Sequence, residues 1–341
     1  MNLRGAISGF GEVALRAHIP GWRTRKGVSI VAVHDPVAER RHDAIREIKS
    51  VRVYDDLELM LDGEAPDFVD IASPPAYHAG ATRLALKAKA HVLVEKPLCL
   101  TLAEFDELAA LASGNDRVLM CVHNWKYAPS LVVARHAYVS GRIGPLRSLT
   151  LDRLRTGPAG AGGSGEKWRS GVATGGGILI DHGWHVMYLM QWLMGSGAPR
   201  AISAQLGTSA GGGVEDMANL RVIFPEGRFA TAHLSWRAAL RRTTTTLYGE
   251  SATIEIEGER VTLTERSGAV EDLSVKDHDD DSYHPSWFAA MAEDFERTIV
   301  AGPASGKARQ NLAEARIALA LILAARESAS RGGDEIPILQ T

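Results

Sequence analysis

The chain has 341 residues, of which 23% are charged, and its formal net charge is −3. No long block of like charge lies along it, so neither nucleic acid nor an anionic membrane is expected as a partner. Two cysteines make no disulfide framework, and no apolar segment has the pattern of a signal peptide or the length of a membrane span. We therefore expect a cytoplasmic protein of about two domains.

From residue 3 to about residue 122, short apolar runs alternate with helical patterns. The predicted strands are Leu3–Ser8, Val28–His34, Phe68–Ile71, His91–Val94 and Val118–Val122, and the predicted helices between them are Pro36–Ile48, Ala79–Ala88 and Leu102–Ala112. Strands that alternate with helices form βαβ units, whose right-handed crossovers place helices on both faces of a parallel sheet. We expect residues 1–122 to form a doubly wound Rossmann domain of the α/β class.

Residues 123–341 follow another pattern. An almost wholly apolar run, Ile178–Met194, predicts a buried helix, and alternation such as that in Thr253–Glu257 predicts antiparallel strands with unlike faces. The predicted strands are Arg228–Trp236, Thr243–Tyr248, Thr253–Glu257, Val261–Glu265 and Val270–Val275, and the predicted closing helices are Pro285–Val300 and Lys307–Ser330. We expect a second, α+β domain with a mostly antiparallel sheet.

The first predicted strand is followed by a glycine-rich turn, Gly9-Phe10-Gly11-Glu12-Val13-Ala14, which matches G-x-G-x-x-A. Gly9 permits the tight turn, Gly11 lets the backbone approach a pyrophosphate, and a small Ala14 lets the next helix pack on the strand. The diphosphate of a dinucleotide would then meet the N-terminus of that helix. We predict a dinucleotide site at Gly9, Phe10, Gly11, Glu12 and Val13.

The second predicted strand ends at Asp35, at the distance expected of a ribose-binding acid. A carboxylate there accepts hydrogen bonds from the adenosine hydroxyls and repels a 2′-phosphate, which favours NAD. NADP stays possible because Arg40 or Arg41 could meet a phosphate. Asp35 could also cap the helix that begins near Pro36.

Two further groups carry chemistry. Lys96 follows the strand His91–Val94, and ligands of open α/β sheets bind at such carboxyl ends. An ammonium there could lie beside the nicotinamide, although a solvated strand end is the alternative. Asp181 and His185 are four residues apart and share one face of a buried helix, so this face should line a polar pocket in which His185 could act as a general base. A structural Asp–His pair is the alternative.

No metal site is expected. The neighbours Asp181 and His182 point in different directions on a helix, so they should not converge with His185 on one ion. The segment His278–His284, which contains Asp279, Asp280 and Asp281, is interpreted as a solvated acidic loop. The segment His123–Tyr127 follows the last Rossmann strand and borders the cleft, unless it is a plain interdomain linker.

These elements, in this order, resemble the Gfo/Idh/MocA family, which includes glucose-fructose oxidoreductase and inositol 2-dehydrogenase. Besides the glycine turn, the resemblance rests on the turn Ser73–His78, on Val94-Glu95-Lys96-Pro97 and on the segment Gly175–His185. It implies that Lys96, Asp181 and His185, although they come from different domains, act together on the substrate carbinol. The residues implied near the cofactor are Ser73, Pro74, His78, Glu95, Lys96, Asn124, Trp168 and Arg169.

The resemblance also implies a large open-faced sheet that joins subunits, hence a homodimer or homotetramer. Three residues depart from the usual pattern: Lys126 stands where arginine is usual, Tyr188 where aspartate is frequent, and His182 where an apolar residue is usual. These departures flank the substrate region, and we expect Lys126, Tyr127 and His182 to contact the substrate.

The implied reaction is hydride transfer between a nicotinamide and the carbinol carbon of a polyol or sugar-like substrate. His185 would take the hydroxyl proton, Lys96 would stabilise the alkoxide, and Asp181 would hold the histidine or a substrate hydroxyl. Two alternatives remain. One is a redox-neutral epimerase, isomerase or glycoside-cleaving enzyme with tightly bound NAD, and the other is a non-enzymatic NAD(P)-sensing regulator.

Overall fold

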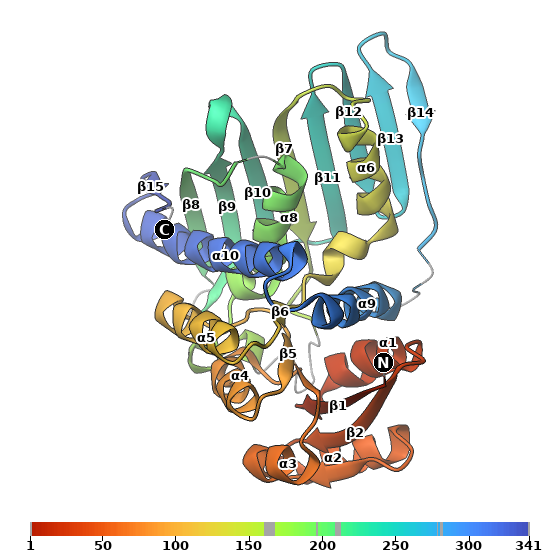
Figure 1. Ribbon diagram of the computed structural model, residues 1–341. Helices are drawn as coiled ribbons and strands as arrows, with labels where there is room; N and C mark the ends of the chain where they lie inside the picture. The colour runs from red at the N-terminus through yellow and green to blue at the C-terminus, as the bar shows by residue number, and fades with distance from the viewer. Residues whose placement is uncertain are drawn as a thin grey trace. The chain divides into compact units, whose positions relative to one another are not determined.

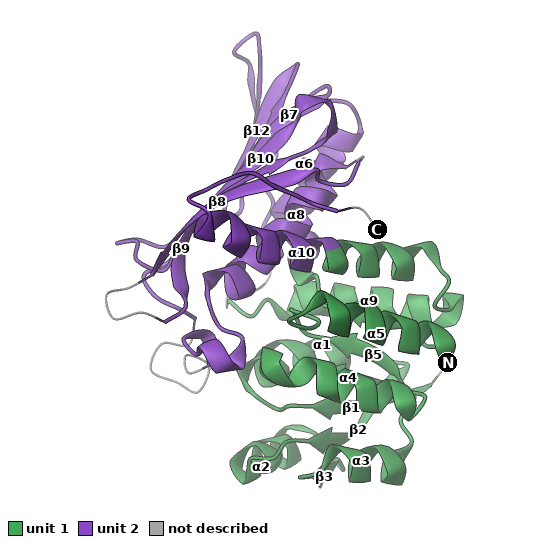
Figure 2. Ribbon diagram, turned by 90° about the vertical axis from the view of Figure 1, so that its left-hand side faces the viewer, with its two compact units in different colours: residues 1–124, 279–316 green, residues 125–278, 317–341 purple. Residues whose placement is uncertain are grey.

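The computed structural model describes residues 2–159, 168–195, 197–208, 213–277, 279 and 282–339. The chain divides into two compact units: unit 1 comprises residues 1–124 and 279–316, and unit 2 comprises residues 125–278 and 317–341 (Figure 2). The sequence-based division at residue 122 falls close to the first of these boundaries. It assigns residues 279–316 to the second domain, whereas these residues pack within unit 1.

The described strands of unit 1 form one parallel sheet in the order β3-β2-β1-β4-β5-β6 (Figure 1). They are β1 (Leu3–Ser8), β2 (Val28–His34), β3 (Arg52–Tyr54), β4 (Phe68–Ile71), β5 (His91–Val94) and β6 (Leu119–Cys121). The strand order reverses between β1 and β4, which pair directly. Ligands of doubly wound sheets bind beyond the carboxyl ends of the strands at such a switch point. Gly9 follows β1 at this point, and Ser73 follows β4.

Helices accompany the strands of unit 1. They are α1 (Ile19–Arg23), α2 (Ala38–Glu47), α3 (Leu57–Glu64), α4 (His78–Lys87), α5 (Leu102–Gly114), α9 (Pro285–Ala301) and the first part of α10 (Gly306–Ser330), with the short turns η1 (Ala14–His18) and η2 (Pro75–Tyr77). Helix α5 starts where its sequence directs, because Thr101 and Glu104 form a reciprocal capping box.

The core of unit 1 explains why a late segment of the chain belongs to it. Helix α9 contributes Phe288 and Phe295, both buried. Phe295 packs edge-on against Phe68 of β4 and Phe288 packs edge-on against Trp22 of α1, with 5.7 Å between ring centroids in each pair. Aromatic rings bury large apolar areas, so α9 completes a core that residues 1–124 leave open on this side.

Unit 2 contains a sheet in which nine strands are described, in the order β14-β13-β12-β11-β7-β10-β9-β8-β15. They are β7 (Leu146–Leu154), β8 (Ala201–Thr208), β9 (Glu215–Ile223), β10 (Phe229–Ser235), β11 (Arg242–Gly249), β12 (Ala252–Glu257), β13 (Arg260–Glu265), β14 (Val270–Asp272) and β15 (Ile336–Pro337). Only β7 and β10 pair in parallel, and the other described pairs are antiparallel. The two sheets confirm the predicted fold class.

Helices of unit 2 lie over one face of this sheet: α6 (Pro129–Val139), α8 (Trp184–Met194) and the last part of α10 (Figure 1). The opposite face presents half-buried and exposed side chains at alternate positions of the strands, among them Thr150, Asp152, Arg221, Phe229 and Thr231. Thr150 and Thr231 hydrogen-bond across the strands at 3.2 Å. The open face is therefore mixed and hydroxyl-rich rather than a continuous apolar patch.

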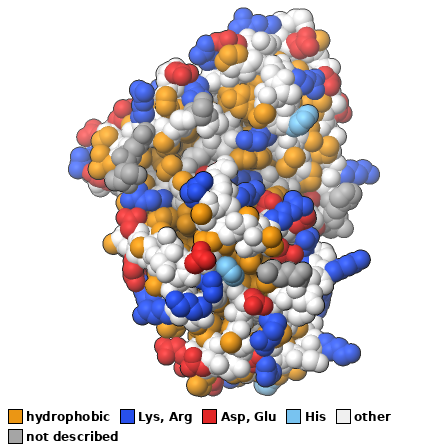
Figure 3. All heavy atoms as spheres, viewed as in Figure 1, with side chains coloured by type: hydrophobic (Ala, Val, Ile, Leu, Met, Phe, Trp, Pro, Cys, Tyr) orange, Lys and Arg blue, Asp and Glu red, His pale blue; other side chains and the backbone are white. Residues whose placement is uncertain are grey.

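The surface is equally mixed in charge. On the face that Figure 3 draws, Lys and Arg side chains are interspersed with Asp and Glu side chains. Among the helices that the structure describes, none combines the length and the hydropathy needed to cross a bilayer.

Candidate active site

The glycine turn after β1 is shaped by its two glycines in different ways. Gly9 has φ of +92°, and a Cβ atom there would lie 2.6 Å from the backbone nitrogen of Ser73. Any other residue would be strained at that position and would collide with the backbone after β4. A Cβ atom on Gly11 would meet no described atom within 4 Å, so the backbone there is open to close approach. This is the shape that a pyrophosphate requires.

Asp35 ties this turn to the end of β2. One carboxylate oxygen accepts the Phe10 amide N–H at 2.8 Å, and the other accepts the Val37 N–H at 2.9 Å. Asp35 therefore links the glycine turn to the approach to α2, and its role as a ribose-binding acid stays a prediction. Each carboxylate oxygen can accept a second hydrogen bond, which leaves capacity for ribose hydroxyls.

The arginines that could read a phosphate have partners of their own. Arg41 donates to the carbonyl oxygen of Asp35 at 2.8 Å, and Arg40 lies 3.7 Å from Glu12 and 3.9 Å from Asp43 in ion pairs. Glu12 itself is an exposed residue of the glycine turn.

The loops after β4 and β5 are joined by His78. Its ring is buried, with Nδ1 2.6 Å from the carbonyl oxygen of Pro97 and Nε2 2.6 Å from that of Ser73. Burial lowers the pKa of His78, and the two carbonyls oppose this shift without reversing it. With a carbonyl oxygen at each nitrogen, the ring holds the two loops together rather than presenting a nitrogen to a ligand.

Two buried oxygen atoms support a bound polar group at this edge of the sheet. Ser73 Oγ and Asn124 Oδ1 are among the buried side-chain atoms of the described residues for which no hydrogen-bond partner is found. Orphaned buried oxygens of this kind are uncommon and call for an explanation. Both belong to residues predicted to contact a cofactor, and together with the glycine turn and Asp35 they fit a dinucleotide.

Lys96 is the second residue after β5 and is half-buried, with a cis peptide bond to Pro97. The preceding Glu95 is buried, and one of its oxygens accepts the Lys96 backbone N–H at 3.0 Å. The other oxygen lies 3.0 Å from Nε2 of His18. His18 is a residue that sequence reasoning misses, since no motif distinguishes it within the helical turn after the glycines.

Asp181 lies on a π-helical turn, η5 (Leu179–Gly183), that precedes α8. Its carboxylate accepts from Nε of Arg169 at 3.1 Å and lies 3.3 Å from Nδ1 of His182. The adjacent side chains Asp181 and His182 therefore approach each other, which contradicts the expectation drawn from ideal helix geometry. A π turn closes i→i+5 hydrogen bonds, so it changes the directions that an α-helix would give.

His185 lies one turn further on and is held by other residues. Its Nδ1 is 2.8 Å from the hydroxyl of Tyr188, and that hydroxyl accepts the backbone N–H of Trp125 at 3.1 Å. The indole of Trp125 stacks on the imidazole, with 4.1 Å between centroids and 7° between planes. Tyr188 and Trp125 thus fix the position of the ring, whereas the contacts described for Asp181 are with Arg169 and His182.

Sequence reasoning did not identify Arg153, which contacts Trp125. The guanidinium of Arg153 lies 5.3 Å from the centroid of the indole and is 1% exposed. Burial, followed by the neighbouring charge of Arg155, lowers the pKa of Arg153 to about 9. The sequence carries a signal for this residue, since period-two alternation through Leu149 and Leu151 places Arg153 on the core face of β7.

The other predicted site residues lie nearby in unit 2. Trp168 and Arg169 stack on each other at 4.4 Å, and residues 160–167 of the glycine-rich segment lie outside the described residues. Lys126 lies 5.8 Å above the Tyr188 ring, and Tyr127 ends the short turn η3 (Asn124–Tyr127) that also carries Trp125. His182 accepts from the indole N–H of Trp236 at 3.3 Å.

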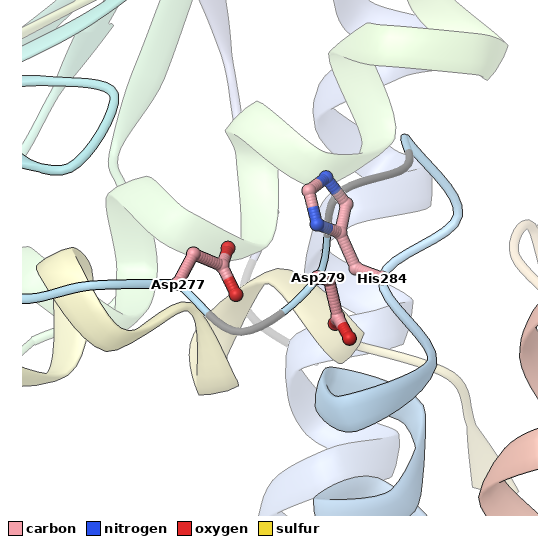
Figure 4. A group of neighbouring side chains, drawn as sticks. All are labelled: Asp277, Asp279 and His284. Atoms are coloured by element: carbon pink, nitrogen blue, oxygen red, sulfur yellow. The ribbon is translucent and has the colours of Figure 1, made fainter.

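The acidic loop contains the one group of potential metal ligands among the described residues: Asp277, Asp279 and His284 (Figure 4). Local contacts account for two of them. Asp279 accepts from the backbone N–H of Ser286 at 3.0 Å and from its hydroxyl at 2.7 Å, at the start of α9, and His284 stacks on Trp287 at 3.6 Å. The predicted loop residues His278, Asp280 and Asp281 lie outside the described residues.

Comparisons with known proteins agree with these motifs. Residues 3–123 match the model of an oxidoreductase family with an NAD-binding Rossmann fold, and residues 131–255 match the GFO/IDH/MocA C-terminal domain. D-glucoside 3-dehydrogenase of Escherichia coli (strain K12) is 30% identical over 202 residues, which are 59% of this chain and 57% of that protein. The chain thus spans little more than half the length of this relative.

Two further matches extend over more of the chain. The NADP(+)-dependent scyllo-inositol 2-dehydrogenase of Bacillus subtilis (strain 168) is 26% identical over 260 residues, 73% of this chain and 75% of that protein. The fold of levoglucosan dehydrogenase, solved with NADH and levoglucosan, superposes with a TM-score of 0.87 at 19% identity and covers 100% of both chains. The chain therefore belongs to the Gfo/Idh/MocA family of oxidoreductases, as its motifs predict, and its first domain is an NAD-binding Rossmann domain.

Proposed function

We propose that this protein is an NAD-dependent dehydrogenase that moves a hydride between a nicotinamide and the carbinol carbon of a polyol, sugar or sugar derivative. The observation that carries the proposal is the buried His185, whose ring is fixed by Tyr188 and Trp125 in a chain that also has an NAD-binding domain. Relatives of the same family are dehydrogenases of a glucoside and of an inositol by name.

The chemistry requires a base and a cation at the reacting hydroxyl. When bound, the nicotinamide supplies the hydride acceptor at C4. His185 takes the hydroxyl proton on Nε2, which requires Nδ1 to carry the other ring proton. The Tyr188 hydroxyl can accept that Nδ1–H, since its oxygen has two lone pairs and the Trp125 N–H uses one. The Lys96 ammonium stabilises the developing alkoxide. Asp181, paired with Arg169, orients a neighbouring substrate hydroxyl.

The proposal is tested by incubating the purified protein with NAD and a panel of polyols, aldoses and glycosides at alkaline pH, and following NADH absorbance. Turnover of at least one carbinol substrate is expected. If no member reduces NAD while the protein holds a nicotinamide that does not exchange with free NAD during conversion of a sugar, the redox-neutral alternative replaces the dehydrogenase. Binding of NAD without conversion of any substrate would favour the regulator.

Asp35 should set the preference for NAD over NADP. Asp35→Ser removes the negative charge that faces a 2′-phosphate, so the ratio of kcat/KM for NAD to that for NADP should fall by about tenfold or more. A like-charge contact costs on the order of 1 kcal/mol or more, and 1.4 kcal/mol is about tenfold. Steady-state kinetics with both cofactors measure the ratio.

Asp56→Ser is the matched control, since Asp56 accepts the Leu59 N–H in the same way at the start of α3. This variant should leave the cofactor ratio unchanged. If the wild-type protein already uses NADP with the higher kcat/KM, Asp35 is only a structural acid, and Arg40 or Arg41 reads the phosphate.

We further propose a homo-oligomer, a dimer or tetramer, formed through the open face of the unit 2 sheet. Helices cover only one face of that sheet in the described part of the chain, and the mixed apolar and polar character of the other face is typical of subunit interfaces. Light scattering at micromolar concentration should give a mass of two or four times 36.7 kDa. A mass near that of one chain would contradict it.

The cytoplasm is the compartment that we propose. Both cysteines, Cys99 and Cys121, are buried free thiols, as expected of a protein in a reducing environment.

A further inference from the structure

The proposed reaction makes no use of His18, a fully buried histidine of unit 1. His18 ends the π turn η1 after the glycine motif, and its side chain is 0% exposed. Nδ1 lies 2.9 Å and 3.0 Å from the two oxygens of Asp70 in β4, and Nε2 lies 3.0 Å from Glu95 after β5. Asp70 also accepts the indole N–H of Trp22 at 2.7 Å. The imidazole therefore bridges the ends of two neighbouring strands.

The partners of this ring define its charge. A carboxylate oxygen only accepts hydrogen bonds, so a ring with a carboxylate at each nitrogen must donate from both and is an imidazolium. Burial alone lowers the pKa of His18, but the charges and hydrogen bonds of Asp70 and Glu95 outweigh it and raise the pKa from 6.5 to about 9. Phe288, which stacks on the ring, carries no charge, and Lys96 is the next charged group beyond Glu95.

Glu95 connects this imidazolium to the backbone of Lys96. One Glu95 oxygen binds Nε2 of His18, and the other accepts the Lys96 N–H at 3.0 Å. Burial alone would raise the pKa of Glu95, but His18 and then Lys96 reverse that effect, so its pKa falls below the usual value. Phe288 stacks on the His18 ring at 3.8 Å and 13°, which prevents the ring from turning away from Glu95.

We infer that His18 is a positioning residue that stays protonated through the neutral pH range and, through the ionised Glu95, fixes the backbone from which Lys96 reaches the reacting hydroxyl. This inference rests on the proposed function only for the role of Lys96. The charged state of His18 and its link to Glu95 are properties of unit 1 alone.

If the contacts of His18 with Asp70 and Glu95 were only structural salt bridges, mutation of His18 would have different consequences from those of a positioning role. Such a mutation would change stability and leave the rate and its pH dependence unchanged in any folded variant. A positioning role predicts a loss in kcat with little change in KM for NAD, together with a pH profile that reports Glu95. These readouts separate the two roles.

The first experiment requires no substrate. NMR of protein with isotope-labelled histidine rings should show one imidazole protonated on both nitrogens at pH 7.5, which loses its proton only near pH 9. Glu95→Gln removes one of the two carboxylates and should move that titration to lower pH, which assigns the signal to His18. A His18 ring that is neutral at pH 7.5 would overturn the inference.

Stability provides a second readout of the charge. Because the folded pKa of His18 lies above its unfolded value, its contribution is fully present below about pH 6.5 and is lost as the pH rises through about 9. The difference in Tm between wild type and His18→Gln should therefore be largest near pH 6 and should shrink toward pH 10. A difference that does not vary with pH would contradict an ionised ring.

The kinetic experiment uses His18→Gln, which keeps a hydrogen-bonding side chain but removes the charge. We expect kcat to fall about 10–100-fold, which is the usual cost of losing a group that orients another functional residue. The KM for NAD should stay within about threefold of the wild-type value. Without its charged donor, Glu95 becomes protonated at higher pH, so kcat should gain an acid limb at least about one pH unit above any in wild type. The double variant His18→Gln/Glu95→Gln should lack this limb.

His91→Gln is the matched control. His91 begins β5, the strand that Glu95 follows, and its Nδ1 accepts the Val118 N–H at 2.9 Å. Burial and then the charge of Arg117 lower the pKa of His91 to about 4, so its ring is neutral. This variant should keep wild-type kcat and pH profile. Folded His18→Gln with wild-type kcat and pH profile would overturn the positioning role. If no substrate is found, the NMR and Tm results still decide the state of His18, so failure of the proposed function is recognised separately.

Discussion

Replacing His185 by alanine should lower kcat about 10²–10⁴-fold, the range over which positioned acid–base groups contribute to catalysis. The affinity for NAD should change little, because the glycine turn and Asp35 belong to unit 1 and His185 to unit 2. Tyr188→Phe should give a smaller loss, since it removes only the hydroxyl that holds Nδ1. Asp181→Asn should fall between wild type and His185→Ala if Asp181 orients the substrate.

The measurement is kcat and KM on the substrate found by the NAD assay, with NAD affinity taken from fluorescence quenching. His233→Ala is a matched control in the same unit, because His233 lies on the open face of β10 and bonds Asn219. Near-wild-type turnover of His185→Ala would exclude His185 as the base, and His182 would become the candidate base.

Lys96→Met should produce a loss of similar size, since it removes the cation that we propose stabilises the forming alkoxide and keeps a side chain of similar length. The informative measurement is the double variant Lys96→Met/His185→Ala. Residues that act as a unit on one transition state are strongly non-additive, so the double variant should be little slower than the slower single variant. Lys87→Met, on the exposed end of α4, is the control for loss of a lysine in the same unit.

Fully multiplicative losses in the double variant would show that Lys96 and His185 contribute to separate steps. That outcome would show that Lys96 and His185 contribute independently, and it would contradict a single catalytic unit. An unchanged kcat in Lys96→Met would show that Lys96 takes no part in the chemical step. The family assignment, which depends on the sequence motifs, would not change.

The strands of unit 1 could be predicted closely, and there is a physical reason. Strands β1, β2, β4 and β5 begin and end at the predicted residues, because a buried parallel strand is a predominantly apolar run that ends near Gly, Pro or a charged residue. Strand β3 is only three residues long and has no such run. In unit 2, β7, β8 and β9 are not among the predicted strands, although polar and apolar residues alternate in them; in β7, Arg153 occupies a core position.

The residues of the candidate site could be predicted from the sequence better than the contacts that they make. The glycine turn and Asp35 meet as the motif requires, because Gly9 fits only where its backbone approaches Ser73. The pairing of Asp181 with His185 rested on an α-helical spacing of four. The structure has a π turn at Asp181, and no propensity in the sequence indicates it. Partners from distant strands and helices, such as His18 with Asp70, are set by tertiary packing.

Unit 1 consists of two stretches of the chain that are separated by most of unit 2, and this has a consequence for folding during synthesis. Residues 1–124 leave the ribosome first, but α9, whose Phe288 and Phe295 complete their core, follows only after almost all of unit 2. At translation rates of roughly 5–20 residues per second, this delay is on the order of 10–40 s. During that time Trp22 and Phe68 remain uncovered on one side, so the nascent Rossmann half is a natural client for a chaperone. Its final folding step therefore waits until residues 125–278 of unit 2 have been synthesised.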